Sequence, residues 1–299
     1  VMKDNEKMYE GVREGLKKII DIQRYYRKLL LGKLHPFEFF KLDESHKFIN
    51  GIIKLLKGSD LNKLSKEDVK SFSDFIKDYE TNFNMREIGK YGLDDIHGNF
   101  IKEGISPEIS EIESNIKKYE KVIYDERIRL VKLLDIQSKG NTPPIILHIS
   151  AEKKEYNFQM TKTRYGLLKK KKGFEMDMKS MYEPRTIGNN VKFFNSKLRG
   201  ISKYILCEKE KLKNEVKAFY LGKMAEYSKL YGNVMERISN YIAEIDVVQS
   251  NVKCSNEYGY CKPELVECEE SFFDCKEIRH PILERLPFSG EYITNDLGL

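Results

Sequence analysis

The chain has 299 residues, of which 40% are hydrophobic and 33% charged, with a formal net charge of +6 and no Trp. No apolar run approaches the ~18 residues that a membrane-spanning helix requires, and the polar first residues do not resemble a signal peptide. The composition favours a soluble, helix-rich protein of one or two domains. Five cysteines, an odd number, favour reduced thiols in an intracellular, cytosol-like compartment.

Helical periodicity fills the first part of the chain. From Gly11 to Leu56 apolar residues recur at three- and four-residue spacing, with a predicted break at Gly32–Pro36 because a proline cannot donate to a helix ladder. Ser65–Asp68 predicts the start of a second helix, with Ser as the cap and acids in the first turn.

Residues 81–107 are punctuated by Gly and Pro, which predicts a loop or short turns. Ser106 followed by Pro107 then predicts a helix start, because a cap followed by proline is typical of the first helical turn. An apolar stripe extends this helix from about Glu108 to Leu134.

The positive charge is concentrated between Lys139 and Lys203. This segment holds fifteen Lys and Arg residues against five Asp and Glu, a net charge of +10 that leaves −4 for the rest of the chain. A local basic field of this kind attracts polyanions. Strand-like patterns also occur here, in the apolar run Ile145–Ile149 and in Tyr156–Met160, where apolar and aromatic residues alternate with Asn and Gln.

After the basic segment, a periodic apolar pattern from Ile201 to about Ser250 predicts one helix of roughly 70 Å, although Gly222 and Gly232 weaken its continuity. From Val252 onward Pro and Gly break the pattern, and short strands are expected instead.

Several short stretches along the chain stand out together by their order. They are Asp21–Pro36, Phe100–Glu108, Tyr156–Lys162, Val191–Leu198, Ala243–Val248, Tyr260–Pro263, Arg279–Glu284 and Tyr292–Asp296. In this order they resemble segments of the MutS family of DNA mismatch-repair ATPases: its helical core, the opening, strand and closing stretch of its clamp, its junction with the ATPase domain, and the first ATPase strands.

The resemblance implies a mainly α fold in which long lever helices carry a small α+β clamp with short antiparallel strands, followed by the first strands of a truncated ATPase domain. It implies a helical core and lever over 1–107, the clamp over 108–200, a returning lever helix over 201–250 and the start of the ATPase domain over 251–299. The implied partner is double-stranded DNA and not a membrane, and the intact protein is expected to dimerise through its ATPase domain.

Two family motifs do not occur in this sequence: the G-x-x-x-x-G-K-[ST] phosphate loop and the Phe-x-Glu mismatch wedge. We therefore expect no catalytic residue, no metal site and no cofactor within these residues. The resemblance implies that ATP and Mg bind to the intact protein, which would be a DNA-dependent ATPase.

Basic side chains of the charged segment are the candidate DNA contacts, because ammonium and guanidinium groups suit phosphate contacts that position a protein on duplex without reading its sequence. They are interleaved with aromatic residues and are expected on strands and turns, with Lys169–Lys172 at a loop tip; the alternative is a solvated lysine face. The candidates are Lys153, Lys154, Lys162, Arg164, Lys169, Lys170, Lys171, Lys172, Lys192, Lys197 and Arg199. Where the family stacks an aromatic residue on adenine, this chain has Tyr292, with Ile293 beside it.

Other residues that could carry chemistry have a structural interpretation. The histidines His148 and His280 have no partner at ligand spacing, and the carboxylates Asp21 and Asp246 are expected to make helix-packing contacts. Zinc ligands usually pair two to four residues apart. The seven-residue spacing of Cys254, Cys261, Cys268 and Cys275 is therefore interpreted as coincidence.

Three alternatives remain at this point. Heptad-like runs would also suit a helical structural or protein-interaction fragment that does not bind DNA. An enzyme would need a nucleophile–base or metal constellation, which the sequence does not display. The basic segment could instead bind an anionic membrane surface.

Overall fold

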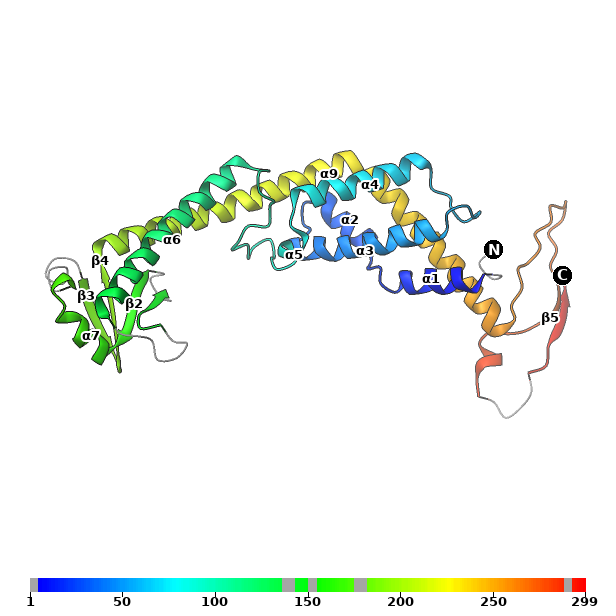
Figure 1. Ribbon diagram of the computed structural model, residues 1–299. Helices are drawn as coiled ribbons and strands as arrows, with labels where there is room; N and C mark the ends of the chain where they lie inside the picture. The colour runs from blue at the N-terminus through cyan, green and yellow to red at the C-terminus, as the bar shows by residue number, and fades with distance from the viewer. Residues whose placement is uncertain (1–4, 136–142, 150–154, 175–181, 288–291) are drawn as a thin grey trace. The chain divides into compact units, whose positions relative to one another are not determined.

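The computed structural model describes residues 5–135, 143–149, 155–174, 182–287 and 292–299 (Figure 1). The chain forms two compact units, residues 1–252 and residues 253–299. It is mainly α-helical with a small antiparallel sheet, as the sequence predicts. Within the described ranges, no helix is both long and apolar enough to cross a membrane.

The first unit begins with short and medium helices. The predicted break at Gly32–Pro36 is confirmed, because α2 ends before it and Pro36 is the first residue of α3. A second break at residues 17–21 is a correction to the expected continuous pattern. Asp21 causes it by capping α2: its side chain accepts a hydrogen bond from the backbone amide of Arg24. The helices are α1 (Glu6–Leu16), α2 (Ile22–Leu30), α3 (Pro36–Leu55), α4 (Lys66–Asn82) and α5 (Met85–Ile88).

Aromatic rings form the centre of this helical core. Phe39 of α3 meets Tyr79 of α4 and Tyr220 of α9 edge to face, with ring centroids 5.1 and 6.4 Å apart. Phe75 of α4 lies 5.5 Å from the ring of Tyr227. All five rings are fully buried. Edge-to-face pairs add to the free energy of burial, so these contacts fasten α3 and α4 to α9.

A buried chain of hydrogen bonds runs through the same core. Tyr79 donates to the Asp43 carboxylate at 2.8 Å, and Lys47 donates to the other oxygen of that carboxylate at 2.6 Å. The Tyr79 oxygen therefore accepts from Nδ1 of His46 at 3.1 Å, which leaves Nε2 to accept from Tyr26 at 2.9 Å. Each of these five side chains has a hydrogen-bond partner in the network, which offsets the cost of burying its polar groups in a low-dielectric core.

Two long helices dominate the rest of the unit. The helix α6 (Pro107–Leu134) begins at the predicted cap, and its seven-spaced Ile109, Ile116, Ile123 and Leu130 are all buried. The predicted long helix is confirmed as α9 (Ser196–Tyr258), and neither Gly222 nor Gly232 interrupts it. The two helices are held together by Tyr119 and Tyr204, whose ring centroids are 4.3 Å apart.

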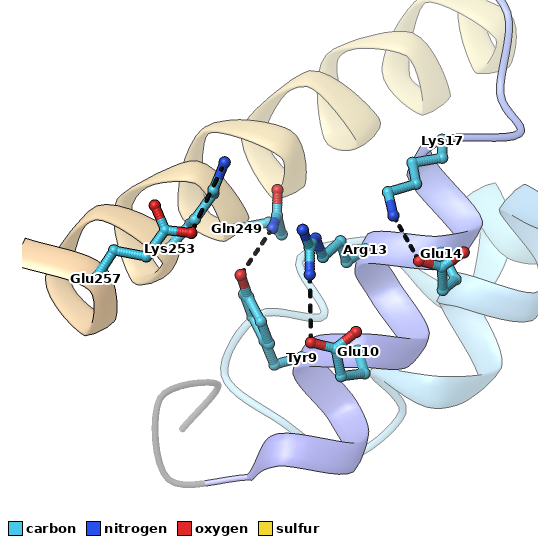
Figure 2. Close-up of polar contacts among 8 residues, drawn as sticks. All are labelled: Tyr9, Glu10, Arg13, Glu14, Lys17, Gln249, Lys253 and Glu257. Carbon is cyan, nitrogen blue, oxygen red and sulfur yellow. Dashed lines mark hydrogen bonds and ion pairs between the residues drawn. The ribbon is translucent and has the colours of Figure 1, made fainter.

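Polar contacts fix α9 to the N-terminal helices. Arg237 forms an ion pair with Asp68 of α4 at 2.5 Å, and Tyr231 donates to Asp78 of α4 at 3.3 Å. Figure 2 shows a third contact, in which Gln249 donates to the hydroxyl of Tyr9 on α1 at 3.3 Å. These contacts join α9 to α4 through Tyr231 and Arg237, and to α1 through Gln249.

The second unit is small. The helix α9 extends to Tyr258, beyond the expected end near Ser250, and stops where the predicted helix-breaking stretch Tyr258–Pro263 begins. The expected short strands are confirmed as β5 (Asp274–Ile278) and β6 (Asn295–Gly298), which pair antiparallel. A 3₁₀ turn, η1 (Leu283–Arg285), lies between them in the sequence and brings Glu284 to Arg279 at 3.3 Å.

Candidate nucleic-acid interface

The basic segment folds into a small α+β body, which we call the basic head: strands β1–β4 and helix α7 (Lys162–Lys169) (Figure 1). The predicted strands are confirmed as β1 (Ile146–Ile149) and β2 (Tyr156–Thr161). They are joined by β3 (Tyr182–Ile187) and β4 (Asn190–Asn195) in an antiparallel sheet of order β1-β2-β4-β3.

The strand alternation gives the sheet two different faces. Phe158 and Phe193 lie opposite each other on one face, where α7 adds Tyr165 with its ring centroid 5.5 Å from that of Phe193. On the other face the register aligns Gln159, Lys192 and Arg185 in one row across three strands. The apolar face therefore carries the core of the head, and the polar row lies on the opposite face.

The region around α7 differs from the expectation of strands and turns. Lys162 and Arg164 lie in α7, Lys169 is its last residue, and Lys170 is its C-cap rather than part of a loop tip. The helix forms because Thr161 caps it by accepting from the amide of Arg164 at 3.4 Å, and because Tyr165 and Leu168, three residues apart, are buried on one side.

The candidate basic residues fall into two groups. Those whose side chains are exposed are Lys162, Lys169, Lys170, Lys171, Lys172 and Lys197. Three others are half-buried: Lys192, Arg164, which donates to the carbonyl of Pro144 at 3.5 Å, and Arg199, which approaches Glu155 at 3.9 Å. The exposed lysines can reach a ligand, whereas the two arginines also hold the head together. Lys153 and Lys154 lie outside the described residues.

Arg185 is a basic residue of this surface that the sequence argument missed. It is exposed and lies beside Lys192 because β3 and β4 form a hairpin with Gly188 and Asn189 at its turn. Gly188 has a φ of 58°, a conformation that glycine adopts without steric cost. The Ile-Gly-Asn-Asn sequence at 187–190 is the signal that could have revealed the hairpin and its register.

The aromatic residues of the head do not contribute charge. Burial raises the pKa of Tyr156 and of Tyr165, so both hydroxyls stay protonated near neutral pH. The Tyr156 hydroxyl donates to Glu120 of α6 at 3.2 Å, and Lys209 of α9 donates to the same carboxylate at 2.9 Å. This triad ties the sheet to both long helices.

The second unit contains the other candidate site. The hydroxyl of Tyr292 accepts a hydrogen bond from the backbone amide of His280 at 2.7 Å, while Ile293 is 79% exposed. The imidazole of His280 itself accepts from the amides of Ile282 and Leu283, which is a structural role. All five cysteines are free thiols, and among the described residues no three His, Cys, Asp or Glu side chains gather as a metal site would require.

Comparison with known proteins relates this geometry to other chains. No family model matches the sequence. The chain is 24% identical to a putative DNA mismatch repair protein, a mutS homolog of Acanthamoeba polyphaga mimivirus, over 98% of its own length and 28% of the relative. It is 24% identical to the DNA mismatch repair protein MutS of Lactococcus lactis subsp. cremoris over 96% of its length, and 26% identical to that of Ehrlichia chaffeensis over 97%.

The chain spans about a third of the length of the curated relatives that it matches. The similarity extends over nearly every residue of this chain, through the helical core, the basic head, the long returning helix and the small C-terminal unit. Along nearly its whole length, the chain is thus similar to MutS mismatch-repair proteins.

Proposed function

We propose that these residues form a DNA-binding core, lever and clamp region of a MutS-like mismatch-repair protein, in which the basic head holds duplex DNA through its phosphates. The observation that carries this proposal is the cluster of exposed lysines at the end of α7, Lys169–Lys172. Lysines with exposed side chains suit phosphate contacts that are independent of sequence. The names of the relatives support a role in mismatch repair.

The proposal assigns a role to each part of the chain. Residues 1–107 would be the core and lever, 108–200 the clamp, 201–250 the returning lever helix, and 251–299 the start of an ATPase domain. Rigid α6 and α9 joined by the Glu120–Lys209 pair would transmit movement to the head. In the intact protein, ATP and Mg would bind in an ATPase domain that also forms the dimer, with Tyr292 and the exposed Ile293 as its contacts to the nucleotide base.

The test is duplex affinity after removal of the lysine cluster. Replacing Lys169–Lys172 together with Ala should weaken binding to a labelled duplex by at least about tenfold at moderate salt, because each lost phosphate contact also lowers counterion release. Fluorescence anisotropy measures the affinity. The matched control replaces four exposed lysines of α3, α4 and the turn between them, Lys54, Lys57, Lys66 and Lys70, and should change the affinity by less than about twofold.

Equal losses in both quadruple variants would mean that only net charge matters, which contradicts a binding site on the head. Unchanged affinity in the Lys169–Lys172 variant would support the alternative of a helical structural or protein-interaction region.

A further inference from the structure

The two edges of the head sheet are built differently. The edge strand β3 carries Pro184 and Arg185, and a proline and a charged side chain are both devices that prevent another strand from pairing with an edge. The other edge strand, β1, has the sequence Ile-Leu-His-Ile and carries neither. In the described part of the chain, the backbone of β1 is hydrogen-bonded to β2 alone. Among the described residues, no backbone group pairs with its outer edge, which favours strand addition there.

The same strand exposes apolar side chains beside a groove. Ile146 is 42% and Ile149 51% exposed. Leu147, which shares a face of the sheet with Ile149, lines a groove of about 450 Å³ with Tyr156 of β2 and Tyr124 of α6. A strand added to β1 would alternate its side chains, so every second one would face this groove. Its apolar walls suit a branched aliphatic side chain.

The rim of the groove is positively charged. Lys117 and Lys121 of α6 line it, and neither has an ion-pair partner among the described residues. The one carboxylate of the rim, Glu120, is already held by Lys209 at 2.9 Å and by the Tyr156 hydroxyl at 3.2 Å. Two exposed ammonium groups thus flank an apolar groove, which favours a ligand that is acidic on either side of an apolar residue.

We propose that β1 is an acceptor strand for an extended, acidic segment of a partner protein. The segment adds a fifth strand to the head sheet, places an aliphatic side chain in the groove beside Leu147, and pairs acidic residues with Lys117 and Lys121. Main-chain hydrogen bonds supply affinity in this mode of recognition, and the groove and lysines supply specificity. This surface lies on a different strand and helix from the Lys169–Lys172 cluster.

The experiment uses a fluorescein-labelled peptide of sequence Thr-Asp-Thr-Ile-Thr-Asp-Thr, in which Asp, Ile and Asp share one face of an extended strand. We expect it to bind and to shift the backbone amide NMR signals of Ile146–Ile149. The double variant Lys117→Glu/Lys121→Glu should weaken binding at least about tenfold, since two exposed ion pairs become repulsive. Lys118→Glu, on the same helix but outside the groove, is the matched control and should leave the affinity unchanged.

Backbone pairing is tested separately with two N-methylated peptides, each blocking one alternating set of amides. Only the peptide whose methylated amides face β1 should fail to bind, because an added strand pairs with β1 through one of its two edges. Equal loss of binding with both methylated peptides, or no loss with either, would overturn the proposal. Peptide binding that is unaffected by Lys117→Glu/Lys121→Glu would also overturn it.

Two further outcomes would also overturn it. Concentration-dependent dimerisation through β1, seen by sedimentation with no binding of peptide, would assign the edge to a second copy of this chain. A parallel loss of duplex affinity in the Lys117→Glu/Lys121→Glu variant would assign the lysines to nucleic acid. Because duplex affinity is measured on the same samples, failure of the peptide proposal is distinguishable from failure of DNA binding by the head.

Discussion

Between about pH 6.5 and pH 3, His46 alone is expected to lower the free energy of unfolding by about 1.4 kcal/mol for each pH unit of acidification. Burial, together with nearby Lys47, lowers the pKa of His46 from 6.5 to about 3. In this window the unfolded chain binds a proton that the folded protein does not. The contribution of the neutral, buried His46 to the free energy of unfolding is therefore fully present above pH 6.5 and is lost as the pH falls toward 3. Urea unfolding followed by circular dichroism at several pH values measures the slope.

The comparison that isolates this contribution is His46→Gln, whose amide can still donate and accept between Tyr26 and Tyr79 but cannot titrate. Between pH 6.5 and pH 3, the free energy of unfolding of His46→Gln should fall less steeply than that of the parent, by about 1.4 kcal/mol per pH unit. Gln23→Ala is the control, because it changes an exposed side chain that does not titrate, and it should keep the parent slope. A His46→Gln variant with an unchanged slope would contradict the assignment of a neutral, buried His46.

The variant Phe193→Ala is expected to lower the free energy of unfolding of the basic head by about 3–5 kcal/mol. Phe193 is fully buried, and its ring lies 5.7 Å from that of Phe158, 5.5 Å from Tyr165 and 6.0 Å from Phe174. Removing it leaves a cavity between the sheet and α7. Because the exposed lysines lie at the end of α7 and directly after it, duplex affinity should fall together with stability. Thermal unfolding and anisotropy on the same sample measure both quantities.

Phe48→Ala removes the same side chain at an exposed position of α3 and should cost less than about 1 kcal/mol with no change in duplex affinity. If the two variants were equally stable, the packing of the head described above would be wrong. If Phe193→Ala unfolded the head but left duplex binding intact, the head would not be the DNA-binding surface.

Local signals in the sequence predicted much of the helical fold. The cap at Ser106, the break before Pro36 and the seven-spaced apolar residues of α6 are each determined within a few residues of sequence. The break at residues 17–21 was missed because Asp21 interrupts a continuous apolar pattern through a single cap hydrogen bond. Helix α7 was missed because its eight residues include Gly166 and only one pair of buried residues, Tyr165 and Leu168, at helical spacing.

Long-range contacts were beyond the reach of the sequence argument. The bonds of His46 to Tyr26 and Tyr79 join residues 20 and 33 positions apart, and no local pattern distinguishes such a histidine from a packed one. Arg185 enters the basic surface only through the register of the β3–β4 hairpin. The candidate lysines could be chosen by charge and resemblance, but which of them are exposed depends on how α7 packs against the sheet.

The salt dependence of duplex binding tests the central claim most directly. The logarithm of the association constant, measured by anisotropy from low to physiological salt, should fall linearly with the logarithm of salt concentration. Each phosphate contact adds a slope of about −0.9, so the exposed lysines of the head predict a slope equivalent to several contacts. Replacement of Lys169–Lys172 by Ala should make that slope shallower. Duplex binding that is independent of salt, or no binding even at low salt, would contradict the proposal that the basic head holds DNA.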